Sequence, residues 1–170
     1  MAGGIQPGTI ATSVDSILSE NRQIDHVVEA IKSMGPDWEI RKSITIEDIL
    51  GEPGEYSFLA NGNSQRWESD GGWIYRNNKL VGVCENKWQA SRKNACERAF
   101  RYLGVFRGDE AWRIFVSCEG PGFVNQFGGG ATGPFIDIMN HAGATVLENE
   151  HDPDEYARRL REWLNRLANS

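Results

Sequence analysis

Cysteine and histidine are scarce in this sequence, which holds three of each among 170 residues. The cysteines Cys84, Cys96 and Cys118 show no CxxC spacing and have no histidine pair nearby, which argues against a zinc site and a disulfide framework. We expect free thiols in a reducing compartment, packed mainly as small apolar core residues. The histidines have no partner at the spacing of metal ligands or of a catalytic triad, so chemistry has to be sought among other residues.

Long apolar runs and linker-like segments are also lacking. No window approaches the roughly eighteen apolar residues of a membrane span, and the first residues carry no basic segment ahead of their apolar positions. No internal repeat or low-complexity stretch interrupts the chain. We therefore expect a single domain over residues 1–170, located in the cytoplasm, with no membrane partner.

Basic charge is in deficit overall, with a net charge of −6, although its distribution is uneven. Residues 87–107 carry six basic side chains and one acid, a local charge of +5, whereas residues 148–155 carry five acids and no base. A chain with one basic face can dock on DNA despite a negative total. On charge alone, a solvated helix face is the favoured interpretation of this basic stretch.

The pattern of apolar residues predicts alternating helices and strands. Helices are expected over residues 12–34, 91–103 and 135–140, with a helical turn at 47–50 and a last helix from Asp152 or Asp154; strands are expected over 38–46, 56–59, 73–75, 80–85, 113–118 and 145–147. Residues 76–79 form the turn of a hairpin. The order indicates an α/β or α+β fold in which helices flank a mixed central sheet.

The expected hairpin brings acidic residues together. Asp70 enters its first arm, and Glu85 and Lys87 leave the second, so they should meet at one end. Two carboxylates beside a lysine suit Mg²⁺-dependent phosphodiester hydrolysis, with metal ligands in Asp70, Glu85 and the backbone carbonyl of Asn86. The plainer interpretation is a surface hairpin with a solvated ion pair.

The next helix begins with side chains able to read base edges. Asn94, Glu97, Arg98 and Arg101 recur at spacings that place them on one helix face. Asparagine pairs with adenine, glutamate accepts from exocyclic amino groups and arginine donates to guanine. The alternative for this face is an exposed salt bridge between Glu97 and Arg101.

In order along the chain stand Asp70-Gly71-Gly72, Glu85-Asn86-Lys87, Asn94-Ala95-Cys96-Glu97-Arg98 and Cys118-Glu119-Gly120. Together these motifs resemble the EcoRI and MunI branch of the PD-(D/E)xK restriction endonucleases, over about residues 68–122. The resemblance implies that branch's nuclease core and a homodimer that cuts both strands of a short palindrome with Mg²⁺. Asp70 and Glu85 would bind the metal, Lys87 would act on the attacking water, and Asn94, Glu97 and Arg98 would read an inner AATT.

Neighbouring residues bear on the outer base pair of that palindrome. Arg92, two residues before Asn94, favours CAATTG over GAATTC, whereas Lys93 stands where the family has glycine. Ser69 replaces the usual proline. Two other functions remain open: a repair or recombination nuclease that selects DNA structure, and a sequence-specific DNA-binding protein that does not cut.

Overall fold

The computed structural model describes residues 24–45, 48–49, 67–87, 92–118, 133–148 and 153–170. A helix at residues 24–34 comes first; then follow β1 (Trp38–Ile44), β2 (Trp67–Arg76), β3 (Lys79–Lys87), α3 (Arg92–Val105), a 3₁₀ helix (Gly108–Arg113), β4 (Ile114–Cys118), α4 (Gly133–Ala142), β5 (Thr145–Glu148) and α5 (Pro153–Ala168). The strand expected at 56–59 and the first half of the 12–34 helix lie outside the described residues.

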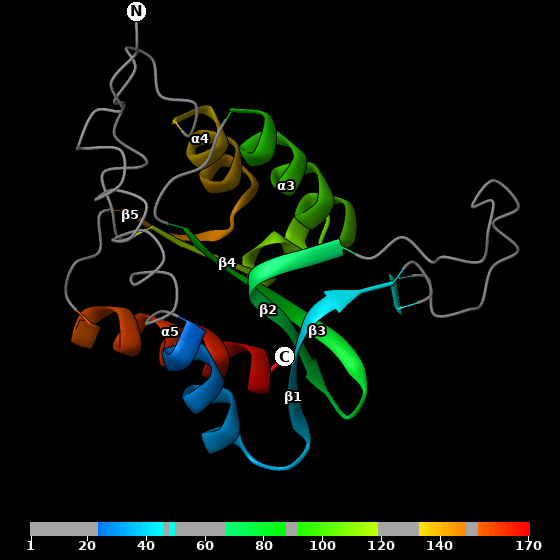
Figure 1. The fold of residues 1–170 in the computed structure, drawn as a ribbon, viewed down its shortest axis with the longest axis vertical. Helices are drawn as coiled ribbons and strands as arrows, with labels where there is room; N and C mark the ends of the chain where they lie inside the picture. The colour runs from blue at the N-terminus through cyan, green and yellow to red at the C-terminus, as the bar shows by residue number, and fades with distance from the viewer. Residues whose placement is uncertain (1–23, 46–47, 50–66, 88–91, 119–132, 149–152) are drawn as a thin grey trace, which may run out of the picture.

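The five strands form one mixed sheet in the order of the sequence. β1, β2 and β3 are antiparallel, and β4 and β5 continue the sheet parallel to β3 (Figure 1). A parallel neighbour needs a crossover connection, which α3 supplies between β3 and β4. The expected class of a mixed sheet flanked by helices is confirmed.

The β2–β3 hairpin turns at Asn77 and Asn78, which have φ values of 50° and 61°. Asparagine tolerates this left-handed region better than other residues with a side chain, and a two-residue turn of this kind matches the twist of the strands. The turn pairs Arg76 with Lys79, and a register shift between Ile74 and Tyr75 then leads to the pairing of Gly72 with Cys84.

Helices cover both faces of the sheet. The 24–34 helix and α5 lie on one face, and α3 and α4 lie on the other (Figure 1). Side chains alternate between the two layers along each strand, so that Trp73 and Tyr75 pack toward α3 while Ile74 packs toward α5. The inner face predicted for the last helix is buried as expected, at Tyr156, Leu160, Trp163, Leu164 and Leu167.

Two expectations about local structure need correction. β2 begins at Trp67, so Asp70, Gly71 and Gly72 lie within a strand and not in a loop before it. The 3₁₀ helix before β4 was not foreseen. No helix among the described residues is both long and apolar enough to cross a membrane.

Candidate functional site

β2 lies unusually close to β3 at Gly71 and to β1 at Gly72. A Cβ atom on Gly71 would lie 2.4 Å from the carbonyl oxygen of Cys84, and one on Gly72 would lie 2.5 Å from Cγ1 of Ile40. Gly72 also has a φ of +113°, in a region that side chains disfavour. Glycine is therefore required at both positions, and the close approach brings the backbone N–H of Asp70 to 3.2 Å from Oε2 of Glu85.

Glu85 is the centre of a buried hydrogen-bond cluster, with a side chain only 1% exposed. Its Oε2 accepts the Asp70 N–H and a hydrogen bond from the Tyr102 hydroxyl, and the Ser69 hydroxyl lies 3.1 Å away. The Ser69 hydroxyl also donates to the Cys84 carbonyl and accepts the Gly72 N–H at 3.2 Å. Buried charge is tolerated only with such partners, so the local structure is arranged to keep a carboxylate here.

Arg98 joins the two acidic side chains. One guanidinium nitrogen pairs with Oε1 of Glu85, and the other lies 3.2 Å from Oδ2 of Asp70. Burial is the largest single influence on the pKa of Arg98 and works to lower it, but the charge of Glu85 and the interactions with Tyr102 together outweigh burial and raise that pKa above its usual value. Asp70 and Glu85, which come from neighbouring strands, thus converge on one position that already holds a positive charge.

Tyr102 supports this arrangement from α3. Burial, followed by the charge of Glu85, raises the pKa of Tyr102 well above its usual value. Its hydroxyl therefore stays protonated at any ordinary pH and donates a hydrogen bond to the carboxylate. The side chain is fully buried and lies edge-on to the ring of Trp73.

The side chain of Asn86 points to the opposite face of the sheet from Glu85, as strand alternation requires. It is fully buried, and its Oδ1 accepts hydrogen bonds from Ser117 at 2.8 Å and from Tyr156 at 3.0 Å. This network ties the end of β3 to β4 and α5. The Asn86 side chain is therefore structural, and the expectation of a ligand here rests on its backbone carbonyl alone.

The predicted DNA-reading residues divide within α3. Glu97 and Arg101 form an exposed ion pair, whereas Arg98 turns toward the carboxylates and is 21% exposed. The face expected to be shared by Glu97, Arg98 and Arg101 is thus split in two. Arg92, Lys93 and Asn94 lie in the first turn of the helix, with side chains outside the described residues.

Lys87 closes β3, where its backbone pairs with Cys118 of β4. Its side chain is outside the described residues. Strand alternation nevertheless places positions 85 and 87 on the same face of the sheet. The predicted proximity of Asp70 and Glu85 is found, and the position of the Lys87 amine stays a prediction.

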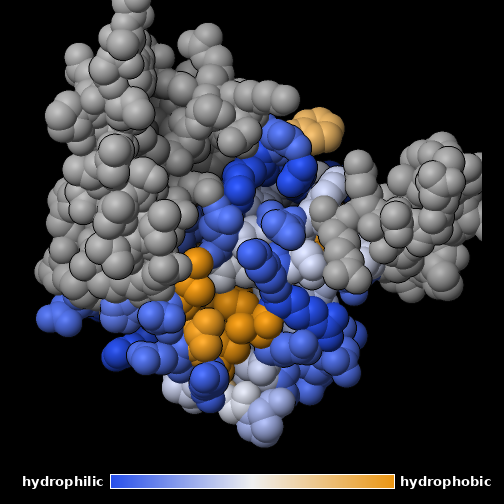
Figure 2. Space-filling view, viewed as in Figure 1, coloured by the Kyte–Doolittle hydropathy of each residue, from blue (hydrophilic) through white to orange (hydrophobic). Residues whose placement is uncertain are grey.

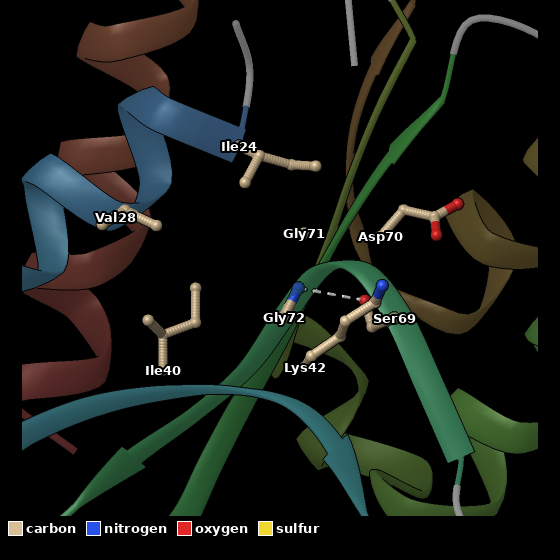
Figure 3. Close-up of a pocket in the computed structure, with 8 residues that line it drawn as sticks. All are labelled: Ile24, Val28, Ile40, Lys42, Ser69, Asp70, Gly71 and Gly72. Atoms are coloured by element: carbon tan, nitrogen blue, oxygen red, sulfur yellow. Dashed lines mark hydrogen bonds between the residues drawn. The ribbon is translucent and has the colours of Figure 1, made fainter. Parts of the chain in front are cut away.

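A pocket of about 320 Å³ opens beside Asp70, between the 24–34 helix and the bend of β2 (Figure 3). Ile24, Val28 and Ile40 form its apolar side, and Lys42 lines it from β1. Figure 2 shows apolar surface on this face of the molecule between the helix and β1. Asp70 lines this pocket, although its carboxylate points away from Ile24, Val28 and Ile40 (Figure 3); its side chain is 24% exposed, whereas that of Glu85 is enclosed.

The donor set suits Mg²⁺ in kind and in number. No group of three or more His, Cys, Asp or Glu side chains suited to a metal occurs in the described part of the chain. Mg²⁺ needs no such cage, because one or two carboxylates commonly hold it together with waters and substrate phosphates. Asp70 and Glu85 supply two hard oxygen ligands around a position that favours positive charge, so the residues fit this ion.

Sequence reasoning missed the residues that hold Glu85 in place. Tyr102 follows Arg98 by four positions and so shares its helix face, which is a signal that the sequence does contain. Ser69 was treated only as a departure from a family proline. Nothing in the sequence linked its hydroxyl to a glutamate sixteen positions away.

Comparison with known proteins gives no match. No protein-family model, no curated protein and no solved structure matches this chain. Function is therefore inferred from the residues and their geometry.

Proposed function

We propose that this protein is a Mg²⁺-dependent, sequence-specific endonuclease that hydrolyses phosphodiester bonds in double-stranded DNA. The observation that carries the proposal is the convergence of Asp70 and Glu85, from adjacent strands, on one position occupied by the guanidinium of Arg98. A surface hairpin with a solvated ion pair would not bury its glutamate or surround it with donors.

The arrangement of strands supports the same proposal. A PD-(D/E)xK core of the EcoRI and MunI type is expected to carry its acidic pair on an antiparallel hairpin, followed by a helix and a parallel strand. β2, β3, α3 and β4 follow that order. Fold alone names no chemistry, so this agreement adds weight only together with the acidic pair.

Each residue has a defined role in the proposed reaction. Asp70 and Glu85 would hold the metal, and the backbone carbonyl of Asn86 could supply a further oxygen. When bound, Mg²⁺ supplies an activated water and neutralises charge on the phosphate. Lys87 would orient the attacking water and help to remove its proton. Ser69 and Tyr102 fix Glu85 so that it does not reorient during the reaction.

The proposed substrate is a short palindrome with an inner AATT, and CAATTG is preferred over GAATTC. Asn94, Glu97 and Arg98 are proposed to read bases from the major groove, with Arg92, Lys93 and Arg101 at the flanking bases and backbone. A palindrome calls for a two-fold protein, so the proposal includes a homodimer. It also includes a cytoplasmic location.

Cleavage of random-sequence DNA, followed by mapping of the ends, tests the proposal. We expect Mg²⁺-dependent cuts at one short sequence and none with EDTA. Lys87→Ala should abolish cutting but leave Ca²⁺-supported DNA binding, whereas Lys79→Ala, an exposed lysine at the other end of β3, should cut normally. Cuts without sequence preference would favour a structure-selective nuclease, and binding without cutting would favour a DNA-binding module.

A further inference from the structure

The two oxygens of the Glu85 carboxylate have different surroundings. Oε2 is held by uncharged donors, namely the Asp70 N–H and the Tyr102 hydroxyl, and the Ser69 hydroxyl lies 3.1 Å from it. Oε1 pairs with the guanidinium of Arg98. Departure of Arg98 would therefore leave Glu85 anchored through Oε2, with Oε1 still directed at the same position.

Asp70 is more exposed than Glu85. Its side chain is 24% exposed, it borders the pocket of Figure 3, and its Oδ2 lies 3.2 Å from the second Arg98 nitrogen. The contacts of Arg98 are thus with Oε1 of Glu85 and Oδ2 of Asp70, one oxygen from each acid. These two oxygens are the ones that a shared cation would need.

We infer that Arg98 and a divalent cation are alternative occupants of the Asp70–Glu85 pair, so that Arg98 becomes available to DNA only after the cation has replaced it. This inference rests on the proposed function, because it concerns the site and the base-reading helix named there. It adds a coupling between the acidic pair and the base-reading helix. In the protein without DNA, Arg98 is paired with Asp70 and Glu85 and is not available to read bases.

Electrostatic repulsion explains why Arg98 and a divalent cation cannot occupy the Asp70–Glu85 pair together. Two positive groups a few ångströms apart in a partly buried site repel each other strongly, and each carboxylate oxygen can face only one of them closely. Cation binding must therefore displace the guanidinium. By linkage, whatever draws Arg98 away, including DNA, strengthens cation binding by the same factor.

Metal binding by the DNA-free protein tests the exchange directly. Mn²⁺ serves as the probe, and the electron paramagnetic resonance signal of the free ion reports its binding. Arg98→Gln removes the competing charge, and we expect it to bind Mn²⁺ roughly tenfold more tightly than the unsubstituted protein, within the usual range of coupling between sites. Equal or weaker binding by Arg98→Gln overturns the inference.

Arg101→Gln is the matched control. It makes the same change of charge on the same helix, but Arg101 pairs with Glu97 and not with the acidic pair. Because an exposed charge is screened by salt, we expect its effect on Mn²⁺ affinity to stay below about twofold. If Arg101→Gln tightens binding as much as Arg98→Gln does, the gain is general electrostatics and the exchange is refuted.

A second readout uses the unsubstituted chain and does not depend on the stability of Arg98→Gln. Arginine Nε–H signals are followed by NMR, and the Arg98 signal is assigned by its loss in Arg98→Lys. Added Mg²⁺ should shift the Arg98 signal and leave that of Arg101 in place. An Arg98 signal that does not move at saturating Mg²⁺ overturns the inference.

The cleavage assay keeps this inference separate from the proposed function. Mg²⁺-dependent cleavage by the unsubstituted protein, combined with equal Mn²⁺ affinities for all three proteins, overturns the exchange and leaves the nuclease intact. Absence of both cleavage and metal binding in every variant overturns both.

Discussion

The hydroxyl of Tyr102 donates a hydrogen bond to the carboxylate of Glu85 inside the protein, where neither side chain meets solvent. Tyr102 stands on α3 and Glu85 on β3, so the contact fixes the helix against the strand that carries the acidic residue. A charged group at this depth is stable only while its partners remain. The contact therefore links the stability of the fold to the geometry of the site.

Tyr102→Phe is expected to lower the free energy of unfolding by about 1–3 kcal/mol, since a buried carboxylate oxygen loses one of its donors. It should also raise the Mg²⁺ concentration that gives half-maximal cleavage, because Glu85 is then held less firmly. Urea unfolding and a metal titration of cleavage measure the two effects.

Tyr156→Phe is the control for Tyr102→Phe. It removes a buried hydroxyl that donates to Asn86 on the other face of β3. A similar loss of stability is expected, with no change in the Mg²⁺ requirement. If both variants shift the Mg²⁺ requirement equally, Tyr102 acts only through general stability and does not position Glu85.

Gly71→Ala is expected to disrupt the site through the backbone. The added Cβ would lie 2.4 Å from the Cys84 carbonyl oxygen, so β2 must move away from β3 and carry Asp70 with it. We expect a loss of stability above about 2 kcal/mol, as for other severe steric conflicts, and a loss of cleavage. Thermal unfolding and plasmid cleavage test this result.

Gly104→Ala provides the comparison for Gly71→Ala. A Cβ at this position in α3 meets nothing within 4 Å. Alanine is favoured over glycine in helices by roughly 0.5–1 kcal/mol, so this variant should be slightly more stable than the unsubstituted protein. Equal effects at both glycines would show that the close approach of β2 and β3 is not what requires Gly71.

Local sequence patterns predicted much of the framework. The spacing of Tyr156, Leu160 and Trp163 gave the buried face of α5, and the Asn77-Asn78 turn gave the hairpin. The turn aligned the two strands near Tyr75, but a register shift between Ile74 and Tyr75 changes the pairing farther along, so the exact register at Asp70 did not follow from the turn alone. The helix face and the hairpin depend on residues close in sequence or on one strand pair, where periodicity and turn geometry suffice.

The contacts around Glu85 were beyond the same reasoning. Helical spacing groups Glu97, Arg98 and Arg101, but it does not tell which of them turns toward the sheet. That choice depends on how α3 packs across β3, which is a long-range property. The strand character of Gly71 and Gly72 was missed for a related reason, because glycine disfavours strands unless another backbone comes close.

Glu97 allows a test of base reading, a role that does not depend on the geometry of the acidic pair. It is exposed and paired with Arg101, so its loss should have little effect on the fold. Glu97→Ala is expected to remove the preference for a duplex containing CAATTG over a scrambled duplex, measured by mobility shift with Ca²⁺. Glu162→Ala, which removes a comparable exposed partner of Arg158 on α5, should keep that preference. Loss of preference in neither variant argues against base reading by Glu97.

Cys84 predicts how stability responds to alkaline pH. Burial, followed by the charge of Glu85, raises the pKa of its thiol above its usual value of 9.0, so near pH 10 the unfolded chain has lost a proton that the folded chain retains. Stability must then fall as pH rises, by about 1 kcal/mol between pH 8 and pH 10 for this one group.

Cys84→Ala lacks the thiol and should lose correspondingly less stability over that interval, although it starts from a lower value at pH 7. The buried hydroxyls of Tyr102 and Tyr156 ionise in the unfolded chain of both proteins and so cancel in the difference. Urea unfolding of the two proteins at pH 7, 8, 9 and 10 measures the effect, and parallel pH profiles would mean that the thiol is not kept protonated by burial.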